Sequence, residues 1–333
     1  MKRVILFFLI FGLFTCSHKQ DFGYSYRCHE KRLGIDVGSG STKLVFAEVD
    51  TCKNKLLKIL EEKNIALKFK ESLHLNNMRL SEKIFKKVKR ELTTFLSQNK
   101  INTQQARGVA TQVFREAKNG DTFINRLGRE TGIRIKIITQ KEEAALGFYA
   151  VTGITNKDPN NILVWDIGGG STQITYKKGG DLISSLGTLA SVSFKNYILK
   201  EKNLSRGTPN PIGLYTAVRV TNHAYMYAKK NISFEFKEDI KGKEVIGIGG
   251  VHYYSIRKQL KKQRQVPYSL FEVNSTSNTR VSWPDTKLES PYKETEVSNL
   301  LLVSGFMKAL NINTVLPLKV NLATGVLFNS EMW

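Results

Sequence analysis

One pattern occurs twice in this 333-residue sequence and limits the folds that the chain can adopt. A strand that ends on an Asp-x-Gly leads into a Gly-rich turn and a second strand, first as GIDVGSGST at 34–42 and again as VWDIGGGST at 164–172. Apolar residues on both sides of each turn predict a β-hairpin. An internal repeat of this kind, in a chain long enough for two domains, predicts two related lobes that face one another.

The two turns have the composition of phosphate-binding loops. Consecutive backbone N–H groups of a Gly-rich turn can point at one spot, and Ser and Thr add hydroxyl donors. The predicted phosphate ligands are Gly38, Ser39, Gly40, Ser41 and Thr42 in the first loop and Gly168, Gly169, Gly170, Ser171 and Thr172 in the second.

An aspartate precedes each turn, Asp36 in the first copy and Asp166 in the second. A bare carboxylate would repel a bound polyphosphate, so these residues make sense if Mg²⁺ lies between them and the phosphates. We therefore expect Asp36 and Asp166 to hold Mg²⁺, directly or through water. The alternative for either copy alone is a plain hairpin.

The rest of the chain alternates strands and helices. After the first hairpin we expect a strand at 56–69, a long amphipathic helix at 80–96, a strand at 108–111, a helix at 114–131 with a break at 119–120, a strand at 133–138 and a helix at 142–151. Residues 156–161 are the best linker, and 208–211 and 265–293 are predicted surface excursions.

The N-terminus is typical of an export signal. Lys2 and Arg3 precede an apolar run at 4–14 that is too short to span a bilayer. We expect residues 1–17 to be a signal peptide and the mature protein to be periplasmic or otherwise exported, without a transmembrane segment. Cleavage by an ordinary signal peptidase near Thr15 and lipoprotein attachment through Cys16 both remain open, as does a buried strand or membrane anchor.

Two cysteines remain in the mature chain, Cys28 and Cys52. Both are twelve residues from Gly40, so an antiparallel hairpin centred there brings them to the same open end. We predict a disulfide between them, which suits an oxidising compartment. Two unrelated free thiols are the alternative.

The chain carries a net charge of +22, which favours an anionic partner: nucleic acid, anionic lipid or a phosphorylated small molecule. Loss of Lys2 and Arg3 with the signal would leave +20. Basic residues cluster at 83–90 and again at 257–264, where Lys258 and Lys261 are predicted to lie on one helical face near the cleft. Each cluster is either a solvated helix face or a track for a polyanion. No recognisable nucleic-acid-reading element accompanies them.

The paired loops resemble those of the actin, sugar-kinase and heat-shock-chaperone superfamily, and more closely those of the exopolyphosphatase/guanosine pentaphosphate phosphatase (Ppx/GppA) family. The segment ATQVFREAKNGD at 110–121 is similar to that family's Ala-Thr-x-x-x-Arg-Glu-Ala-x-Asn-Gly motif, and 138–151, 245–250 and 321–327 resemble its other motifs. The resemblance implies an α/β fold of two ribonuclease-H-like (actin-like ATPase) lobes around a central cleft. Lobe I would comprise 30–155 plus 317–333, and lobe II 156–316.

The resemblance also assigns roles. It implies that Glu143 is the general base that activates water and that Arg115 binds a terminal phosphate, while Gly249 and Gly250 allow close approach of a ligand. The alternatives are that Glu142 or Glu143 merely complements the helix dipole, that Arg115 is a solvated charge, and that the two glycines form a tight turn. No His-Asp pair marks the family's metal phosphohydrolase module, and the scattered histidines do not predict zinc.

The chain departs from the family at Gln173, where a Glu is usual, at Gly40, where the family has Asn, and at Thr139-Gln140, which replace Ser-Gly. An amide can orient water but cannot accept a proton, so Glu143 would carry the proton transfer with Gln173 beside it. We expect Mg²⁺-assisted hydrolysis of phosphoanhydride bonds by water, with the terminal phosphate of inorganic polyphosphate as the favoured target over a nucleotide polyphosphate. The alternatives are an apyrase-like nucleoside di- and triphosphate hydrolase and a non-catalytic protein that binds a phosphorylated ligand. A homodimer remains open.

Overall fold

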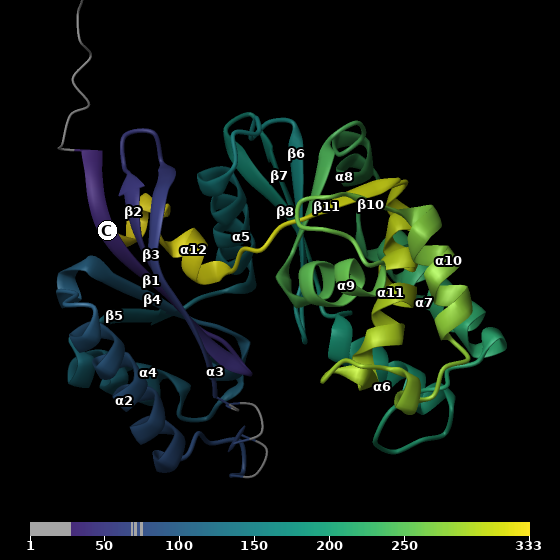
Figure 1. Cartoon of the computed structure of the whole chain (residues 1–333), viewed down its shortest axis with the longest axis horizontal. Coiled ribbons are helices and arrows are strands. Elements are labelled where there is room, and N and C mark those ends of the chain that lie inside the picture. Colours follow the sequence, from purple (N-terminus) through teal and green to yellow (C-terminus); the bar gives the residue numbers. More distant parts are fainter. Residues whose placement is uncertain (1–27, 68, 70–71, 74–75) are drawn as a thin grey trace, which may run out of the picture.

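The computed structural model describes residues 28–67, 69, 72–73 and 76–333 and consists of two α/β lobes (Figure 1). The predicted fold of two facing lobes is confirmed. The predicted signal peptide and Cys16 lie outside the described residues. Within the described part of the chain, no helix has both the length and the apolar character needed to cross a membrane.

Lobe I is built on a five-stranded sheet in the order β3-β2-β1-β4-β5, in which β1 runs antiparallel to β2 and parallel to β4. Its strands are β1 (His29–Val37), β2 (Ser41–Asp50), β3 (Lys55–Ala66), β4 (Ala106–Ala110) and β5 (Arg134–Ile137). One face is covered by α2 (Glu82–Gln98), α3 (Gln112–Glu116) and α4 (Gly120–Thr131). These elements match the strands and helices predicted between 33 and 138.

Lobe II repeats this plan on a six-stranded sheet in the order β10-β11-β9-β6-β7-β8. Its strands are β6 (Ile162–Ile167), β7 (Thr172–Lys178), β8 (Asp181–Gly187), β9 (Glu244–Ile248), β10 (Tyr268–Ser269) and β11 (Thr314–Pro317). Helices on one face include α6 (Ser191–Glu201), α7 (Leu214–Asn231), α10 (Leu270–Arg280) and α11 (Lys293–Leu310). Smaller elements are α8 (Phe234–Asp239), the π-helix η3 (Gly250–Ile256) and α9 (Arg257–Gln259).

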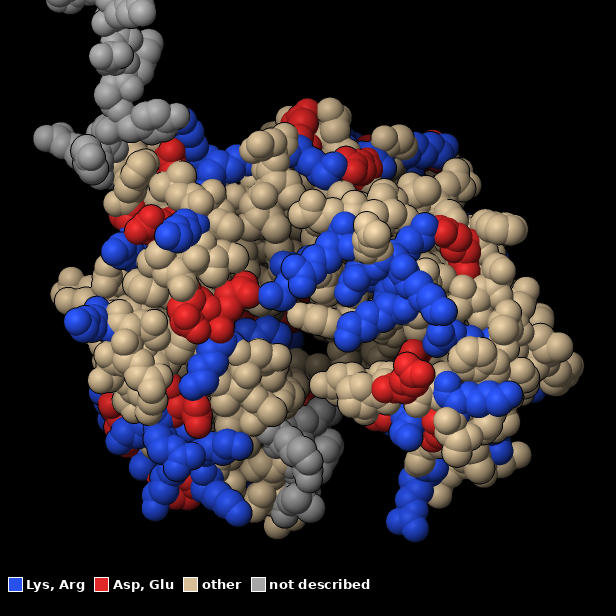
Figure 2. Space-filling view, in the orientation of Figure 1, with Lys and Arg blue, Asp and Glu red and all other residues tan. Residues whose placement is uncertain are grey.

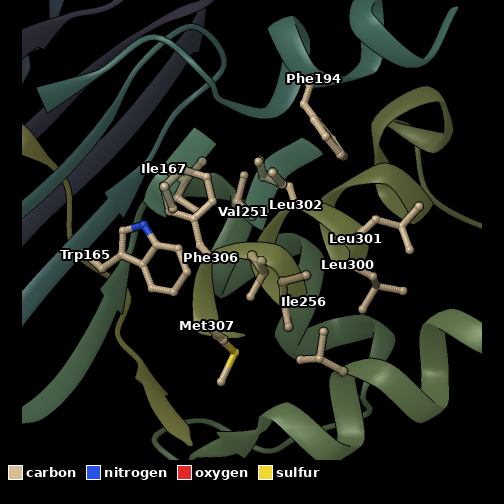
Figure 3. Close-up of a cluster of buried hydrophobic side chains, with 14 of the residues drawn as sticks. Trp165, Ile167, Phe194, Val251, Ile256, Leu300, Leu301, Leu302, Phe306 and Met307 are labelled. Carbon is tan, nitrogen blue, oxygen red and sulfur yellow. The ribbon is translucent and has the colours of Figure 1, made fainter. Parts of the chain in front are cut away.

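The side chains of β6 divide between two cores because they alternate across the sheet. Trp165 and Ile167 are fully buried against the helical layer, where Trp165 stacks on Phe306 of α11 at 5.8 Å between ring centroids (Figure 3). Ile162 and Val164 face the opposite way and pack with α5 (Gln140–Ile154). The Asp166 side chain lies on the same face of the sheet as Ile162 and Val164.

Helices α5 and α12 (Leu322–Val326) lie between the two sheets (Figure 1). The chain enters lobe II after α5 and returns after β11, whose Pro317 still pairs with Gly247 in the sheet of lobe II. The return segment carries α12 onto β1, where a Cβ added at Gly34 would lie 1.9 Å from the Ala323 carbonyl oxygen. Gly34 is therefore required for this close packing.

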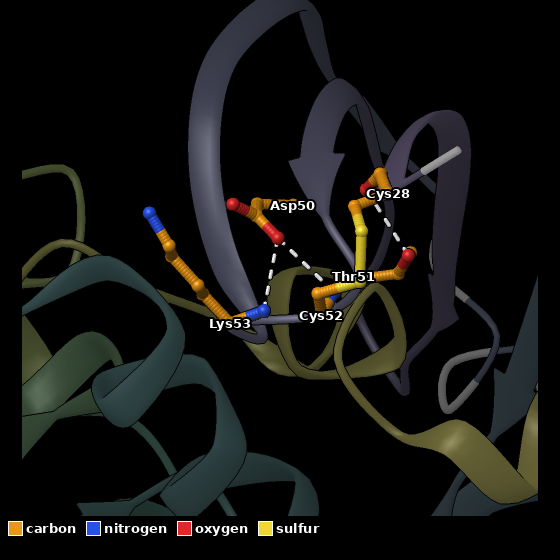
Figure 4. Close-up of a disulfide and its surroundings, with 5 residues drawn as sticks. All are labelled: Cys28, Asp50, Thr51, Cys52 and Lys53. Atoms are coloured by element: carbon orange, nitrogen blue, oxygen red, sulfur yellow. Dashed lines mark hydrogen bonds between the residues drawn. A yellow bond between two sulfur atoms is a disulfide. The ribbon is translucent and has the colours of Figure 1, made fainter. Parts of the chain in front are cut away.

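The predicted disulfide joins Cys28 and Cys52, whose Cα atoms are 5.4 Å apart (Figure 4). The hairpin register is shifted by one residue from the register centred on Gly40, because Val37 pairs with Thr42. Cys28 therefore lies beside Thr51, whose amide donates to the Cys28 carbonyl, and the turn after β2 brings Cys52 into reach. The Asp50 carboxylate accepts the amides of Cys52 and Lys53 and fixes that turn.

The prediction that 265–293 is a surface excursion is wrong in part. The segment contains β10 and the helix α10, which begins after a capping box formed by Ser269 and Glu272. Val273 and Ser277 of α10 are buried against the core of lobe II. Most residues of α10 are polar, so its one buried face gives little hydrophobic signal in the sequence.

Candidate active site

Asp36 and Asp166 lie on the faces of their sheets that look toward α5 and α12. In β1, Ile35 and Val37 are buried under the helices of lobe I, so Asp36 points to the opposite face, as Asp166 does in β6. Each aspartate raises the pKa of Glu143, the third carboxylate of this region. The repeated pattern therefore brings the two predicted metal ligands to one place between the lobes.

The two loops form the same tight turn. The Gly38 amide donates to the Ser41 carbonyl and the Gly168 amide to the Ser171 carbonyl, both at 3.0 Å. These two amides are occupied within the turn and are not free for phosphate, contrary to the prediction. The amides at 39–40 and 169–170 make no hydrogen bond with the described residues and remain available.

The two threonines of the loops do not offer their hydroxyls to a ligand, which corrects a second prediction. Thr42 is fully buried and its hydroxyl has no partner among the described residues. Thr172 is also buried, and its hydroxyl donates to the Leu189 carbonyl at 2.7 Å. The Thr172 hydroxyl holds the second hairpin in place, whereas Ser39, Ser41 and Ser171 are partly exposed.

Asp36 is 2% exposed and is paired with a lysine that the sequence analysis did not single out. The Lys43 ammonium donates to Asp36 Oδ2 at 2.8 Å. The second oxygen of that carboxylate, Oδ1, is buried and has no hydrogen-bond partner among the described residues. Register explains the pair, because Asp36 on β1 lies directly opposite Lys43 on β2.

Asp166 accepts no hydrogen bond from a described residue. Burial raises the pKa of its carboxyl to about 6, with Lys43 opposing the rise and Asp36 adding to it. An orphaned carboxylate oxygen on Asp36 and an unpaired carboxylate on Asp166 are hard oxygen donors of the kind that Mg²⁺ prefers. These two residues therefore fit a magnesium ion.

Glu143 lies in the first turn of α5. The helix begins at a capping box in which the Thr139 hydroxyl accepts the Glu142 amide and the Glu142 carboxylate accepts the Thr139 amide. Glu142 also pairs with Lys136 at 2.8 Å, so it serves the helix start. Glu143, one position further round the helix, is 7% exposed and points to the region of Asp36 and Asp166.

Arg115 forms an ion pair with Glu143, with 2.6 Å between Nη1 and Oε1. The same Nη1 also donates to the Ile138 carbonyl, while Nε and Nη2 have no partner among the described residues. Burial raises the pKa of Glu143 to about 7, and Asp36 and Asp166 add to the rise, although Arg115 lowers it. A carboxyl with a pKa near neutrality is suited to accept a proton.

Gln173 is buried beside Glu143. Its side-chain amide donates to Ser171 Oγ at 2.9 Å and lies 3.5 Å from Glu143 Oε2. The structure thus places the residue that departs from the family in contact with the predicted general base. An amide at this position adds no negative charge to the three carboxylates.

Gly249 adjoins Asp166 at the end of β9. It has φ +80°, and a Cβ there would lie 2.2 Å from Asp166 Oδ1, so both backbone conformation and space require glycine. Gly250 differs, since nothing lies within 4 Å of a Cβ added to it. Of these two glycines, only Gly249 is required for the close approach of the backbone to Asp166.

Lys258 and Lys261 are exposed but do not lie on one helical face, which corrects the prediction. The helix after Gly249 is a π-helix followed by three α-helical residues, and Lys261, with φ +53°, lies beyond its end. Lys258 lies over the ring of Tyr254, with 5.7 Å from Nζ to the ring centroid. The Tyr254 hydroxyl influences the pKa of Lys43, which links this segment to the site. Figure 2 shows Lys and Arg side chains gathered over the segment between α9 and β10, beside the hollow between the lobes.

Two glutamines of lobe I contact the second hairpin, and neither contact was predicted from the sequence. The Gln112 side chain lies against Gly170, where an added Cβ would be 2.4 Å from its Oε1. Gln140 donates to the carbonyls of Gly187, at 3.0 Å, and Thr172. Only the tertiary structure brings these residues together, whereas Lys43 is detectable from the hairpin register.

Comparison with known proteins confirms the resemblance. Residues 48–212 match the sequence model of the Ppx/GppA phosphatase family. A bifunctional 3-dehydroquinate synthase/phosphatase of Fusobacterium nucleatum is 28% identical over 268 residues, which are 77% of this chain and 34% of that protein. The chain thus spans about one third of the length of that relative.

Solved structures of similar proteins share the fold. A Ppx/GppA family member of Aquifex aeolicus superposes with a TM-score of 0.72 at 19% identity, covering 91% of this chain and 98% of that one. An exopolyphosphatase of Cytophaga hutchinsonii gives a TM-score of 0.67 at 16% identity, covering 90% and 97%. The likeness in fold extends well beyond residues 48–212.

Proposed function

We propose that this chain, which resembles the Ppx/GppA phosphatases in both sequence and fold, hydrolyses phosphoanhydride bonds and releases the terminal phosphate of inorganic polyphosphate. The observation that carries the proposal is the convergence of Glu143, Asp36 and Asp166 beside two loops with free amides. The Fusobacterium relative is a bifunctional 3-dehydroquinate synthase/phosphatase, and the Cytophaga structure is that of an exopolyphosphatase.

Each of these residues has a separate role in the proposed reaction. Glu143 takes a proton from water as the water oxygen attacks the terminal phosphorus, and the bond from that phosphorus to the bridging oxygen breaks. Arg115 turns its unpaired Nε and Nη2 donors to the terminal phosphate, and the free loop amides bind the phosphoryl oxygens. Mg²⁺ held by Asp36 and Asp166 would neutralise negative charge on the phosphates.

The charge of the chain favours a polyanion over a mononucleotide. Lys258 and Lys261 are exposed on the segment that follows the third glycine turn, and Lys258 lies over the ring of Tyr254 in the same segment. A long polyphosphate bound at the loops would extend over Lys258 and Lys261 and form an ionic contact with each of them. The predicted export signal and Cys28–Cys52 disulfide support an oxidising, extracytoplasmic location.

The test is phosphate release from long-chain polyphosphate, ATP and ADP, with and without Mg²⁺, by the wild type and Glu143→Gln. We expect Mg²⁺-dependent release from polyphosphate that falls at least about a thousandfold in Glu143→Gln. Glu142→Gln is the matched control and should retain activity, because Glu142 serves the helix cap. A preference for ATP and ADP would favour an apyrase-like enzyme. Binding without turnover would favour a non-catalytic protein, the reading that Gln173 supports.

A further inference from the structure

Lys43 brings a positive charge into the centre of the acidic site. It lies on β2 directly opposite Asp36, and its ammonium is 2.8 Å from Asp36 Oδ2. Its side chain is 34% exposed, whereas the side chain of Asp36 is 3% exposed. The lysine therefore reaches from the partly open side of the hairpin to a buried carboxylate.

Both aspartates act on this ammonium. Burial lowers the pKa of Lys43, but Asp36, through charge and a hydrogen bond, and Asp166, through charge, more than offset it. Asp36 Oδ1 and the Asp166 carboxylate accept no hydrogen bond from the described residues. Lys43 is thus the cation that pairs with Asp36, and its charge also acts on Asp166.

A divalent ion held by Asp36 Oδ1 and the Asp166 carboxylate would bind the same Asp36 carboxylate that already accepts from the Lys43 ammonium through Oδ2. Two cations a few ångströms apart in a partly buried site repel each other strongly. Asp36 could bind the ion through Oδ1, but Lys43 would still lie beside it on Oδ2. The ion and Lys43 therefore compete for the same carboxylates.

We propose that Lys43 is a resident cation that a divalent ion must displace from Asp36, so that Lys43 sets the ion concentration at which the site loads. This inference rests on the proposed function, since it concerns the Mg²⁺ ion of that reaction. Gln173 strengthens the effect, because it supplies no carboxylate to offset the lysine. Without substrate, the site is stable in the absence of a metal and binds a divalent ion from solution weakly.

The experiment measures binding of Mn²⁺, a spectroscopic substitute for Mg²⁺, to the full protein by electron paramagnetic resonance, with no substrate and no turnover. The variants are Lys43→Met, which removes the charge but keeps the length, Lys43→Arg, which keeps the charge, and Asp36→Asn, which removes the ligand. Lys63→Met is the matched control, because Lys63 lies on the neighbouring strand β3 and pairs with Glu91 away from the site. Thermal unfolding confirms that each variant is folded.

We expect Lys43→Met to bind Mn²⁺ about tenfold more tightly or better, with Lys43→Arg and Lys63→Met close to the wild type and Asp36→Asn much weaker. Unchanged or weaker binding by Lys43→Met, with Asp36→Asn still weaker, would overturn the inference and leave the metal-assisted function standing. If Asp36→Asn binds as the wild type does, the aspartates are not the metal site and both proposals fail.

A second measurement uses the wild type, in case Lys43→Met does not fold. Reductive methylation with ¹³C-formaldehyde labels the lysines, and the resonance missing from Lys43→Arg identifies Lys43. We expect Mg²⁺ to shift this resonance as the ammonium leaves Asp36, at the concentration that saturates the site. A resonance that stays in place at saturation contradicts displacement.

Discussion

Arg115 and Glu143 meet at 2.6 Å although they come from different helices of lobe I, α3 and α5. The arginine that we propose to bind the terminal phosphate therefore also stabilises the ionised form of the carboxyl that we propose as general base. A phosphate that draws the guanidinium away would raise the pKa of Glu143 and make it a stronger base. Substrate binding and base strength are coupled through this one ion pair.

Glu143→Gln should stabilise the protein at pH 8 but not at pH 5. The pKa of Glu143 is raised from its ordinary range to about 7, so the fold favours the protonated carboxyl and pays an ionisation cost that is complete only above pH 7. We expect a gain of up to about 3 kcal/mol at pH 8, at 1.4 kcal/mol per pKa unit, and a much smaller difference at pH 5. Urea unfolding at both pH values measures it. Glu142→Gln, whose parent carboxyl has a lowered pKa, should show no such gain.

Gln173→Glu should move the acid limb of the pH–rate profile to higher pH. The Gln173 amide lies 3.5 Å from Glu143 Oε2, and a carboxylate there would raise the pKa of Glu143 by charge repulsion. We expect a shift of about one pH unit in kcat/KM against pH. Gln173→Met removes the amide without adding charge and serves as the control; an equal shift in that variant would show that repulsion is not the cause.

Gly249→Ala should impair both stability and activity. Its positive φ strains any side chain, and the new Cβ would lie 2.2 Å from Asp166 Oδ1. We expect a loss of about 1–3 kcal/mol from the backbone alone, and at least about a hundredfold loss of activity as Asp166 is displaced. Chemical unfolding and phosphate release measure the two effects. Gly250→Ala, which has open space around it, should cost little, and comparable damage there would contradict this account.

The double variant Lys258→Ala/Lys261→Ala should weaken long-chain polyphosphate more than short-chain substrate. Both lysines are exposed on the basic segment beside the hollow between the lobes, so only a long chain would reach them (Figure 2). We expect KM for long chains to rise about tenfold at low salt, with a smaller difference from the wild type as salt rises, and little change for tripolyphosphate. Lys83→Ala/Lys87→Ala on α2 removes the same charge elsewhere. Equal effects of the two double variants would show that the effect comes from the net charge of the protein and not from the position of Lys258 and Lys261.

Loss of the Cys28–Cys52 disulfide should lower stability without lowering kcat. The bond closes a loop with a sequence separation of 24, for which restriction of the unfolded chain is worth about 3 kcal/mol. The phosphate loop lies at the opposite end of the hairpin, so its geometry should persist. Urea unfolding of Cys28→Ser/Cys52→Ser and its kcat on polyphosphate test both halves, and a large fall in kcat would show that the two ends are coupled.

The elements predicted from sequence were those whose signal is local. The repeated hairpins identified Asp36 and Asp166, because strand alternation alone turns both toward the same side. Glu143 and Arg115 came from the resemblance, since nothing in their immediate sequence separates Glu143 from Glu142. Thus local patterns pointed to the proposed metal ligands, and the family motif pointed to the proposed general base.

The errors came from features that depend on packing or on backbone detail. Helical spacing placed Lys258 and Lys261 on one face, but a π-helix changes the period and the positive φ of Lys261 ends it. The Thr42 and Thr172 hydroxyls were assigned to phosphate because the motif does not tell which side of the hairpin they occupy. Gln112 reaches Gly170 only when the two lobes are assembled.

The path of the chain between the lobes fixes the order in which they can be completed during synthesis. The Arg32 guanidinium donates to the Leu327 carbonyl across 295 residues of sequence, and α12 covers the face of β1 that carries Asp36. All of lobe II lies within this interval and can bury its own core before the C-terminal segment is in place. The first hairpin, made early, must wait for α12 before its second face is covered. A chain that ends after lobe II therefore leaves that face of the first hairpin uncovered.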